Sequence, residues 1–201
     1  AVFYVILLYL FLLTILLSQS RSFWIGGVIT FIFMIYYFLS KKIASLKRII
    51  VITVLCLVII FSQISLLSLI TGKNILSTKR LTNISFEPAG QSRINQIQPL
   101  ISEIKKHPIL GSGFGATFMY ETKDPRVLRT QSSGIVKRYS SEWGYLDIIL
   151  KIGILGLFIF IFYIFYILKN LLRKNTVYTI GLFFGFVALL IVHIFTPYLN
   201  H

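Results

Sequence analysis

Apolar residues in this chain are concentrated in five long runs, and the charged residues lie in the stretches between them. The runs occupy residues 1–17, 23–39, 49–70, 152–168 and 177–195. A helix needs roughly 20 apolar residues to cross a hydrocarbon core of ~30 Å, and flanking residues can complete the shorter runs. Helices are expected because every backbone polar group in lipid needs an internal partner. The pattern predicts an all-α polytopic membrane protein with five transmembrane helices.

The composition agrees with a membrane protein. Charged residues make up 13% of the chain and hydrophobic residues 56%, whereas soluble domains carry about 25% charged residues. The single cysteine, Cys56, lies within the third run, so an intrachain disulfide is excluded and the thiol is interpreted as a small apolar filler. Because the chain opens on Ala1 inside an apolar run, we interpret it as a piece of a longer polytopic protein.

Basic residues between the runs predict which side of the membrane each link occupies. The short links at 40–48 and 169–175 hold Lys41, Lys42, Lys47, Arg48, Lys169, Arg173 and Lys174. Short cytoplasmic loops carry an excess of Lys and Arg, so both links are expected in the cytoplasm. The turn at 18–22 is then extracytoplasmic. The predicted organisation is three transmembrane helices in residues 1–70, an extracytoplasmic, partly helical loop at 71–142, and two transmembrane helices in residues 143–201.

The predicted loop is basic, with eleven Lys or Arg residues against five acidic ones. Such a surface favours anionic ligands, for example phospholipid headgroups, pyrophosphate or acidic glycans. A solvated surface lying against anionic lipid is the alternative.

Part of the loop has a helical pattern. Isoleucines at 94, 97, 101 and 104 recur at helical spacing and predict an amphipathic helix on the membrane surface. Pro99 is expected to kink this helix or mark its start, and Pro108 to end it. Residues 116–139 show no clear periodicity and are expected to form an irregular flap.

Two carboxylates lie at the start of the fourth run. Glu142 has no evident local partner and is the candidate base for taking a proton from a sugar hydroxyl; the alternative is a capping role at the helix N-terminus. Asp147 and Lys151 are four residues apart, so an ion pair on the helix surface is the interpretation preferred for Asp147.

Arg21 and a glycine-rich segment are candidates for binding an anion. Arg21 lies in the turn between the first two runs, where it serves either as an anchor reaching the interface or as a phosphate-binding group. Gly111, Gly113 and Gly115 do not match a dinucleotide or Walker loop. A tight turn that lets another group approach closely is the favoured interpretation.

The remaining candidates are aromatic residues and histidines. Trp143 and Tyr145 are either part of an interfacial aromatic belt, together with Phe114, Phe118 and Tyr139, or platforms for sugar rings. The three histidines do not share a metal-ligand spacing, so no metal site is expected.

Three segments, in this order, resemble the C-terminal half of the bacterial O-antigen polymerase and O-antigen ligase superfamily. The first is the Ser-Arg turn at 17–22, which precedes a span. The second leads from Arg93 to residues 107–115 (HPILGSGFG), similar to the Pro-x-x-Gly-x-Gly loop of that superfamily. The third is residues 142–146 (EWGYL), followed by residues 153–156 (GILG) in the next span.

The resemblance implies a metal-independent glycosyltransferase of the bacterial plasma membrane, without a cofactor. Such enzymes move a glycan from undecaprenyl pyrophosphate to an acceptor at the outer face of the membrane. By matching segments, Arg21 and Arg93 are expected to bind the donor pyrophosphate beside the candidate base Glu142. Substrate contacts are expected from Gly111, Gly113, Gly115, Trp143 and Tyr145. The expected partners are lipid-linked oligosaccharide, membrane lipids and other polysaccharide-assembly proteins, and no nucleic acid.

One departure from the superfamily distinguishes two related activities. Ligases typically have a His-Asn pair at the head of the third segment, where this chain has Glu142 and Trp143. This favours a polymerase of repeat units for O-antigen, capsule or exopolysaccharide over a ligase. A membrane transporter or an anion-sensing protein is the alternative from another class.

Overall fold

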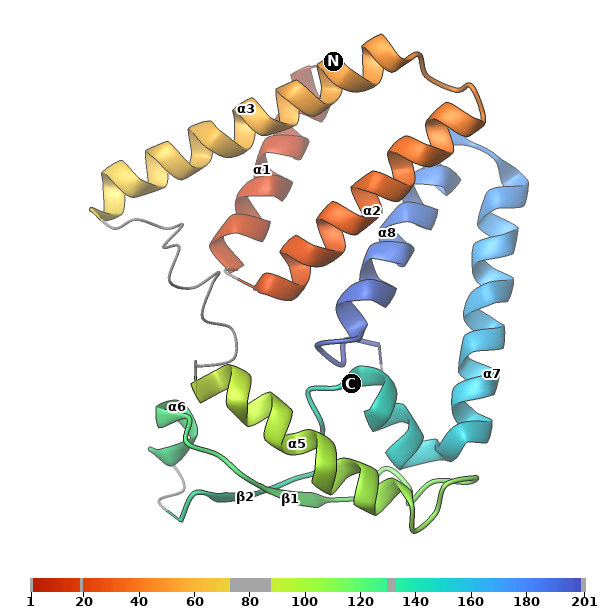
Figure 1. Ribbon diagram of the computed structural model, residues 1–201. Coiled ribbons are helices and arrows are strands. Elements are labelled where there is room, and N and C mark those ends of the chain that lie inside the picture. Colours follow the sequence, from red (N-terminus) through yellow and green to blue (C-terminus); the bar gives the residue numbers. More distant parts are fainter. Residues whose placement is uncertain (1, 19, 73–87, 130–132, 200–201) are drawn as a thin grey trace. The chain divides into compact units, whose positions relative to one another are not determined.

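The computed structural model describes residues 2–18, 20–72, 88–129 and 133–199, which belong to two compact units (Figure 1). The first unit, Ala1–Thr82, holds helices α1 (Val2–Ser18), α2 (Arg21–Ser40) and α3 (Leu46–Thr71). The second unit, Asn83–His201, holds α5 (Pro88–Ile104), β1 (Phe118–Glu121), α6 (Pro125–Leu128), β2 (Ile135–Arg138), α7 (Gly144–Lys174) and α8 (Val177–His193). The beginning of the predicted loop, residues 73–87, lies outside the described residues.

Three of the described helices are long and apolar enough to cross a bilayer. They are α2, α3 up to Ile70, and α7. Helices α1 and α8 are apolar but have 17 residues each, and a helix of this length is about 26 Å long. The prediction of a mainly helical membrane protein is confirmed, whereas the count of five spans stays a prediction.

In the first unit, polar side chains within the apolar runs join the helices. The buried Gln63 of α3 donates from Nε2 to the carbonyl oxygen of Tyr9 in α1 at 2.7 Å. Across the turn between α1 and α2, Trp24 Nε1 donates to the carbonyl oxygen of Ile15 at 3.3 Å. In lipid, apolar contact alone gives helices little reason to associate, and interhelical hydrogen bonds contribute to pairing. These polar groups therefore help to set which helices lie together.

The core of the second unit is small and is built from four elements. Its buried members are Leu100 of α5, Phe118 and Tyr120 of β1, Val136 of β2 and Leu150 of α7. Phe118 is therefore a core residue, and the interpretation that placed it in an interfacial aromatic belt is wrong. The core joins the predicted loop to the start of α7, so the residues on either side of it are held in fixed positions.

Two short antiparallel strands, here called the hairpin, lie within residues 116–139, which were predicted to form an irregular flap. Strands β1 and β2 pair antiparallel, with Tyr120 opposite Val136. Side chains of β1 alternate between buried and exposed, because successive residues of a strand point to opposite faces. Each strand has four residues, which is too short for the alternation to be evident from sequence. The fold is therefore not purely helical.

Helix α5 confirms the predicted helix but corrects its bounds. It begins at Pro88, continues through Pro99 and ends at Ile104, before Pro108 is reached. Its buried face carries Ser92, Gln96 and Leu100 at intervals of four residues. The isoleucine stripe lies to one side of this face, with Ile94 and Ile101 exposed. Contact between this stripe and the membrane surface stays a prediction.

Helix α7 consists of two segments separated by a break at Gly153. The backbone of Gly153 has φ 70° and ψ −177°, a conformation open essentially to glycine alone. The first segment, residues 144–152, is largely buried and the second, residues 154–174, is largely exposed and apolar. Figure 1 shows the change of direction between them. The first segment belongs to the core, and the second has the character of a membrane span.

The glycine-rich loop before β1 is docked against this break by four backbone hydrogen bonds. The amides of Ser112 and Gly113 donate to the carbonyl oxygens of Leu150 and Lys151, at 2.8 and 2.9 Å. In return, the amides of Ile154 and Leu155 donate to the carbonyl oxygens of Pro108 and Ile109 at 2.9 and 3.3 Å. The loop therefore supplies the partners that the interrupted helix lacks.

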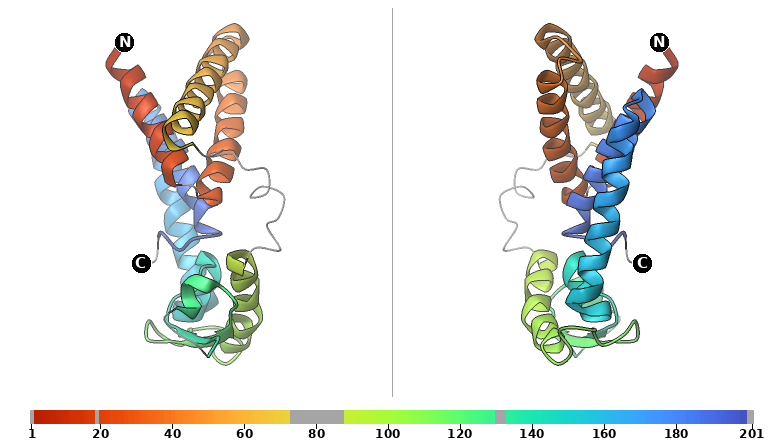
Figure 2. Two further views of the ribbon diagram at one scale, coloured as in Figure 1. Left: turned by 90° about the vertical axis from the view of Figure 1, so that its left-hand side faces the viewer. Right: turned by 90° about the vertical axis from the view of Figure 1, so that its right-hand side faces the viewer.

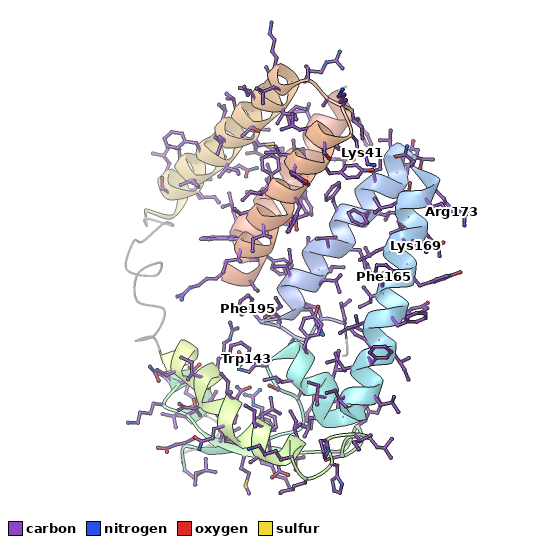
Figure 3. The ribbon with its side chains drawn as sticks, turned by 45° about the vertical axis from the view of Figure 1, so that its right-hand side comes forward. Lys41, Trp143, Phe165, Lys169, Arg173 and Phe195 are labelled. Atoms are coloured by element: carbon purple, nitrogen blue, oxygen red, sulfur yellow. The ribbon has the colours of Figure 1, made fainter. Side chains whose placement is uncertain are left out.

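Helix α8 packs along α7 in the second unit, as both views of Figure 2 show. The link between them is short because Asn175 adopts a left-handed conformation and Thr176 forms a capping box with Thr179. Lys169 and Arg173 lie at the end of α7 opposite Trp143 (Figure 3). This separation of the basic residues from the Trp143 end agrees with the predicted orientation, which itself stays a prediction.

Candidate functional site

Arg93 and Glu142, which are 49 residues apart, form an ion pair in the second unit. Arg93 lies on α5, and Glu142 lies in the turn that precedes α7. The guanidinium Nε of Arg93 donates to Oε2 of Glu142. The side chains are 44% and 38% exposed, so the pair is accessible from outside. Two of the three predicted catalytic residues are thus brought together.

Buried hydrogen bonds hold the turn that carries Glu142. Its amide donates to Oε1 of Gln96 at 3.1 Å, and the amide of Ser141 donates to Oδ1 of Asp147 at 2.8 Å. Gln96, Ser141 and Asp147 are all fully or almost fully buried. The N-cap residue of α7 is Trp143. Glu142 therefore does not have the capping role that was considered for it. The turn is held through its backbone, which leaves the Glu142 carboxylate to meet Arg93.

Replacing Gln96 by leucine should destabilise the second unit. Leucine removes the oxygen that accepts from the Glu142 amide and also, at 3.5 Å, from the Ser141 hydroxyl. A buried donor left without an acceptor costs about 1–3 kcal/mol. Thermal unfolding in detergent should therefore show a lower midpoint for Gln96→Leu. Gln98→Leu on the exposed side of α5 is the matched control, and an equal midpoint for the two variants would contradict the assignment.

Trp143 is fixed between α5 and the end of α8. Its indole Nε1 donates to the carbonyl oxygen of Arg93 at 2.9 Å. Its ring lies 6.2 Å from that of Phe195 in the segment after α8 (Figure 3). The backbone bond places the indole beside the Arg93–Glu142 pair. An aromatic ring in this position is suited to pack against a sugar ring, and this role stays a prediction.

Asp147 and Lys151 form the predicted ion pair, but the pair is buried. Nζ of Lys151 lies 2.6 Å from Oδ2 of Asp147, and the side chains are 5% and 0% exposed. The expectation of a pair on the helix surface was therefore wrong, because both side chains lie on the buried face of the first segment of α7, together with Leu150 of the core. Removing one partner of a buried ion pair therefore costs much more stability than removing one partner of an exposed pair.

The glycine-rich segment has a packing function in this structure. A Cβ atom on Gly111 would lie 2.5 Å from the carbonyl oxygen of Lys151 and from the amide nitrogen of Gly153. The predicted close approach of another group is confirmed for Gly111, and that group is the backbone of α7. The amide of Gly113 already donates to α7, whereas Gly115 is exposed and surrounded by open space. Contacts from these three glycines to substrate stay predictions.

Substitution of Gly111 by alanine should disrupt this docking. Overpacking against backbone costs about 1–3 kcal/mol, and the left-handed conformation of Gly111, with φ 75°, adds about 1–2 kcal/mol for a residue with Cβ. The midpoint of thermal unfolding in detergent should fall clearly. Gly115→Ala, in the same loop, should change it little because nothing lies within 4 Å of the added atom. Equal midpoints would show that the loop is not docked as described.

Tyr145 points toward α8 and contacts a histidine whose importance was not predicted. The Tyr145 hydroxyl donates to the carbonyl oxygen of Leu190 at 3.1 Å, and its ring meets that of His193 edge-on at 4.9 Å. His193 is completely buried, and its Nδ1 accepts from the amide of Leu199 at 3.3 Å. A Cβ atom on Gly144 would collide with His193. Tyr145 thus joins α7 to α8, and its predicted contact with substrate remains untested.

Arg21, the third predicted catalytic residue, belongs to the first unit. It is the first residue of α2 and is partly buried. The N-terminus of a helix carries partial positive charge and unpaired amides. Placing a cation there adds to this potential instead of offsetting it, and the combination favours an anion. The convergence of Arg21 with Arg93 and Glu142 stays a prediction.

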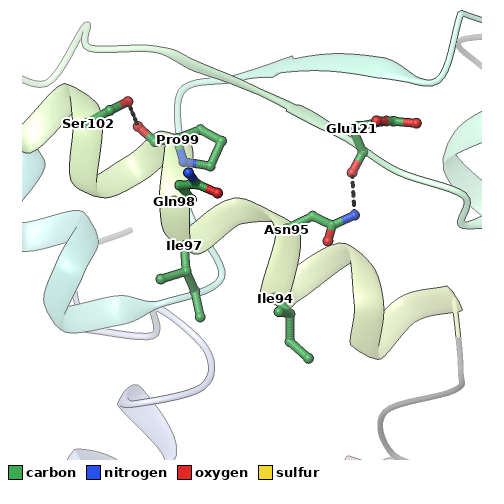
Figure 4. A pocket seen from close by; sticks show the side chains of 7 residues that line it. All are labelled: Ile94, Asn95, Ile97, Gln98, Pro99, Ser102 and Glu121. Atoms are coloured by element: carbon green, nitrogen blue, oxygen red, sulfur yellow. Dashed lines mark hydrogen bonds between the residues drawn. The ribbon is translucent and has the colours of Figure 1, made fainter.

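A pocket lies along the exposed side of α5, apart from the Arg93–Glu142 pair (Figure 4). It is lined by Ile94, Asn95, Ile97, Gln98, Pro99, Ser102 and Glu121. The side-chain amide of Asn95 donates to the carbonyl oxygen of Glu121 at 3.0 Å, which joins α5 to β1 at this point. None of the predicted site residues lines this pocket. Among the described residues, no three His, Cys, Asp or Glu side chains come together as a metal site.

Comparison with protein-family models identifies the family of the chain. A family model described as O-antigen ligase matches residues 6–161. The matched region includes Arg21, Arg93, the glycine-rich loop, Glu142 and the break in α7. No curated protein and no solved structure matches the chain.

Proposed function

Because the chain belongs to the O-antigen ligase family, whose members are membrane glycosyltransferases of the ligase and polymerase type, we propose that it polymerises oligosaccharide repeat units carried on undecaprenyl pyrophosphate. The product is O-antigen, capsule or exopolysaccharide. The reaction takes place at the outer face of the bacterial plasma membrane. The observation that carries this proposal is the accessible Arg93–Glu142 pair, held beside Trp143 by hydrogen bonds from the Glu142 amide to Gln96 and from the Trp143 indole to the Arg93 carbonyl.

The proposed topology has five membrane-spanning helices, with the second unit's α5 and hairpin outside. Three long apolar helices and two shorter ones support it. Helices α1 and α8 would complete their crossings with flanking residues or through local thinning of the bilayer. The basic residues at the end of α7 opposite Trp143 support a cytoplasmic location for that end.

The arginines are proposed to bind the donor. A guanidinium group stays charged and matches phosphate oxygens with two parallel hydrogen bonds. Arg93 is partly exposed and Arg21 stands at a helix N-terminus, so both suit an anion. When the bond to the pyrophosphate breaks, negative charge grows on the departing oxygen. Fixed positive charge at that point lowers the barrier and requires no metal ion.

Binding of the donor would release Glu142 from Arg93. An exposed ion pair contributes only about 0–1 kcal/mol, whereas a pyrophosphate offers Arg93 several charged oxygens. The guanidinium therefore exchanges one carboxylate for a more highly charged partner at little cost. The Glu142 carboxylate becomes available at the moment when the donor is in place, which limits side reactions with water.

In the proposed reaction, Glu142 accepts the proton of an acceptor hydroxyl. The hydroxyl oxygen forms a bond to the anomeric carbon of the donor sugar, and the bond from that carbon to the pyrophosphate breaks. Undecaprenyl pyrophosphate leaves with the bonding electrons, and the proton remains on Glu142. A well-placed base contributes roughly 10²–10⁴ in rate. Trp143 is proposed to orient a sugar ring at this position, with Tyr145 and the glycines at 111, 113 and 115 as further predicted contacts.

A genetic experiment distinguishes polymerase from ligase. If the chain is a polymerase, loss of the gene should leave single lipid-linked repeat units, which gel electrophoresis of the glycans resolves. A ligase mutant would instead accumulate long lipid-linked polymer that is never joined to its acceptor. Complementation with the wild-type gene should restore long chains, and persistence of long lipid-linked chains in the mutant would overturn the polymerase assignment.

A further inference from the structure

The loop from Ile109 to Phe114, here called the anchor loop, presents large apolar side chains to the outside of the second unit. Ile109, Leu110 and Phe114 are 64%, 73% and 70% exposed. They lie outside the core and take no part in the proposed chemistry. Exposed apolar side chains scattered singly need no explanation, but three concentrated within six residues of one loop do. We call these three side chains the apolar patch and ask what they contact in place of water.

The bonds between the anchor loop and α7 fix the position of this patch along the helix. The loop is hydrogen-bonded to α7 on both sides of the break at Gly153, to residues 150 and 151 before it and to residues 154 and 155 after it. Directly after the break, α7 exposes Ile154, Leu155 and Phe158. The exposed apolar part of α7 therefore begins at the residues to which the loop is bonded. This places the loop beside the N-terminal end of the candidate membrane span.

We propose that the anchor loop inserts into the interface of the lipid leaflet that surrounds the N-terminal end of the second α7 segment. Apolar side chains on a rigid surface element enter the boundary between headgroups and acyl chains. Two exposed lysines, Lys105 and Lys106, come just before the loop, and Lys106 also pairs with Glu103. In the proposed arrangement both stand beside the lipid phosphates, a position that long basic side chains favour. The three apolar side chains therefore contact the lipid bilayer.

The anchor loop would also constrain the depth of the site relative to the membrane. Only four residues separate the end of α5 at Ile104 from Ile109, and α5 carries Arg93. Insertion of the loop therefore holds α5 at a constant depth. If the proposed function is correct, this depth matters because the pyrophosphate of a lipid-linked donor lies at the level of the headgroups.

Fluorescence quenching in vesicles tests the insertion and does not depend on activity. Cys56 is the single cysteine of the sequence given, so the full-length protein carrying Cys56→Ser, with any further cysteine also replaced, is the background. Leu110→Cys and Phe114→Cys are each labelled with an environment-sensitive fluorophore. Met119→Cys and Tyr139→Cys, equally exposed apolar positions on the hairpin side, are the matched controls. The protein is reconstituted in vesicles of phosphatidylethanolamine and phosphatidylglycerol.

The proposal expects several-fold stronger quenching at Leu110 and Phe114 by lipids that carry a spin label near the top of the acyl chain. Iodide in the water should quench the Met119 and Tyr139 labels more strongly. Equal quenching at all four positions would overturn a specific anchor, and so would iodide quenching at Leu110 and Phe114 as strong as at the controls. Protection from both quenchers would show a protein contact in place of lipid and would also overturn it. None of these outcomes bears on the catalytic roles of Arg93 and Glu142.

Discussion

Glu142→Gln should abolish long-chain polymer while the protein still accumulates in the membrane. Glutamine keeps the shape of the side chain and a contact with Arg93, but it cannot take a proton from the acceptor hydroxyl. The loss should be roughly 10²–10⁴ in rate, the contribution of a well-placed base. Transfer from a lipid-linked donor by the reconstituted full-length protein measures the rate, and glycan electrophoresis from complemented cells measures chain length.

Glu103→Gln is the matched control for this experiment. Glu103 lies on α5 and forms an exposed ion pair with Lys106 at 2.7 Å, so the variant removes an equivalent charge without touching the proposed site. It should leave polymer length unchanged. Arg93→Ala should also abolish polymer, and because the pair is exposed, the loss of stability should stay within about 1 kcal/mol. Unchanged polymer in either Glu142→Gln or Arg93→Ala would refute the site.

Asp147→Asn should be the most destabilising of the charge-removing substitutions in the second unit. It leaves the ammonium of Lys151 buried without its counter-ion. Breaking a buried pair from one side costs about 3–5 kcal/mol. Asparagine still offers an oxygen to the amide of Ser141, so the change isolates the charge from the hydrogen bond. A lower midpoint of thermal unfolding in detergent is the expected result.

A double variant tests whether the isolated charge is the cause. Asp147→Asn combined with Lys151→Met removes both charges and keeps a side chain of similar length at position 151. The midpoint should return most of the way to that of the wild type, because replacing a buried pair with apolar groups is often close to neutral. A double variant that is less stable than Asp147→Asn alone would contradict this explanation.

The helices could be predicted from the sequence because the spacing and length of apolar runs are local properties. The first segment of α7 was harder to delimit, since the apolar run begins at 152 and the helix begins at Gly144. Its buried charges, Asp147 and Lys151, suggest an exposed helix end when read alone. They are buried because this segment packs inside the second unit, where Leu150 belongs to the core, and such packing is a tertiary feature.

In the candidate site, too, the residue types could be predicted from the sequence, whereas their tertiary contacts could not. The residue types at Arg93 and Glu142 were evident, but their direct pairing depends on how α5 and the turn before α7 pack against the small core. Gln96 was missed because a lone buried glutamine has no signature in the sequence. The four-residue strands were missed because Phe118 and Tyr120 are too few to establish a period.

The bend at Gly153 has a consequence for chimeric proteins. A helix that bends because of its own sequence keeps its bend in any context, whereas this one depends on carbonyl and amide partners supplied by residues 108–113. Grafting a foreign loop in their place would let residues 150–155 restore ordinary helical hydrogen bonds. Helix α7 would then straighten, and Glu142 would move away from Arg93. The loop and the bend therefore depend on each other. A chimera between relatives would have to exchange both segments together.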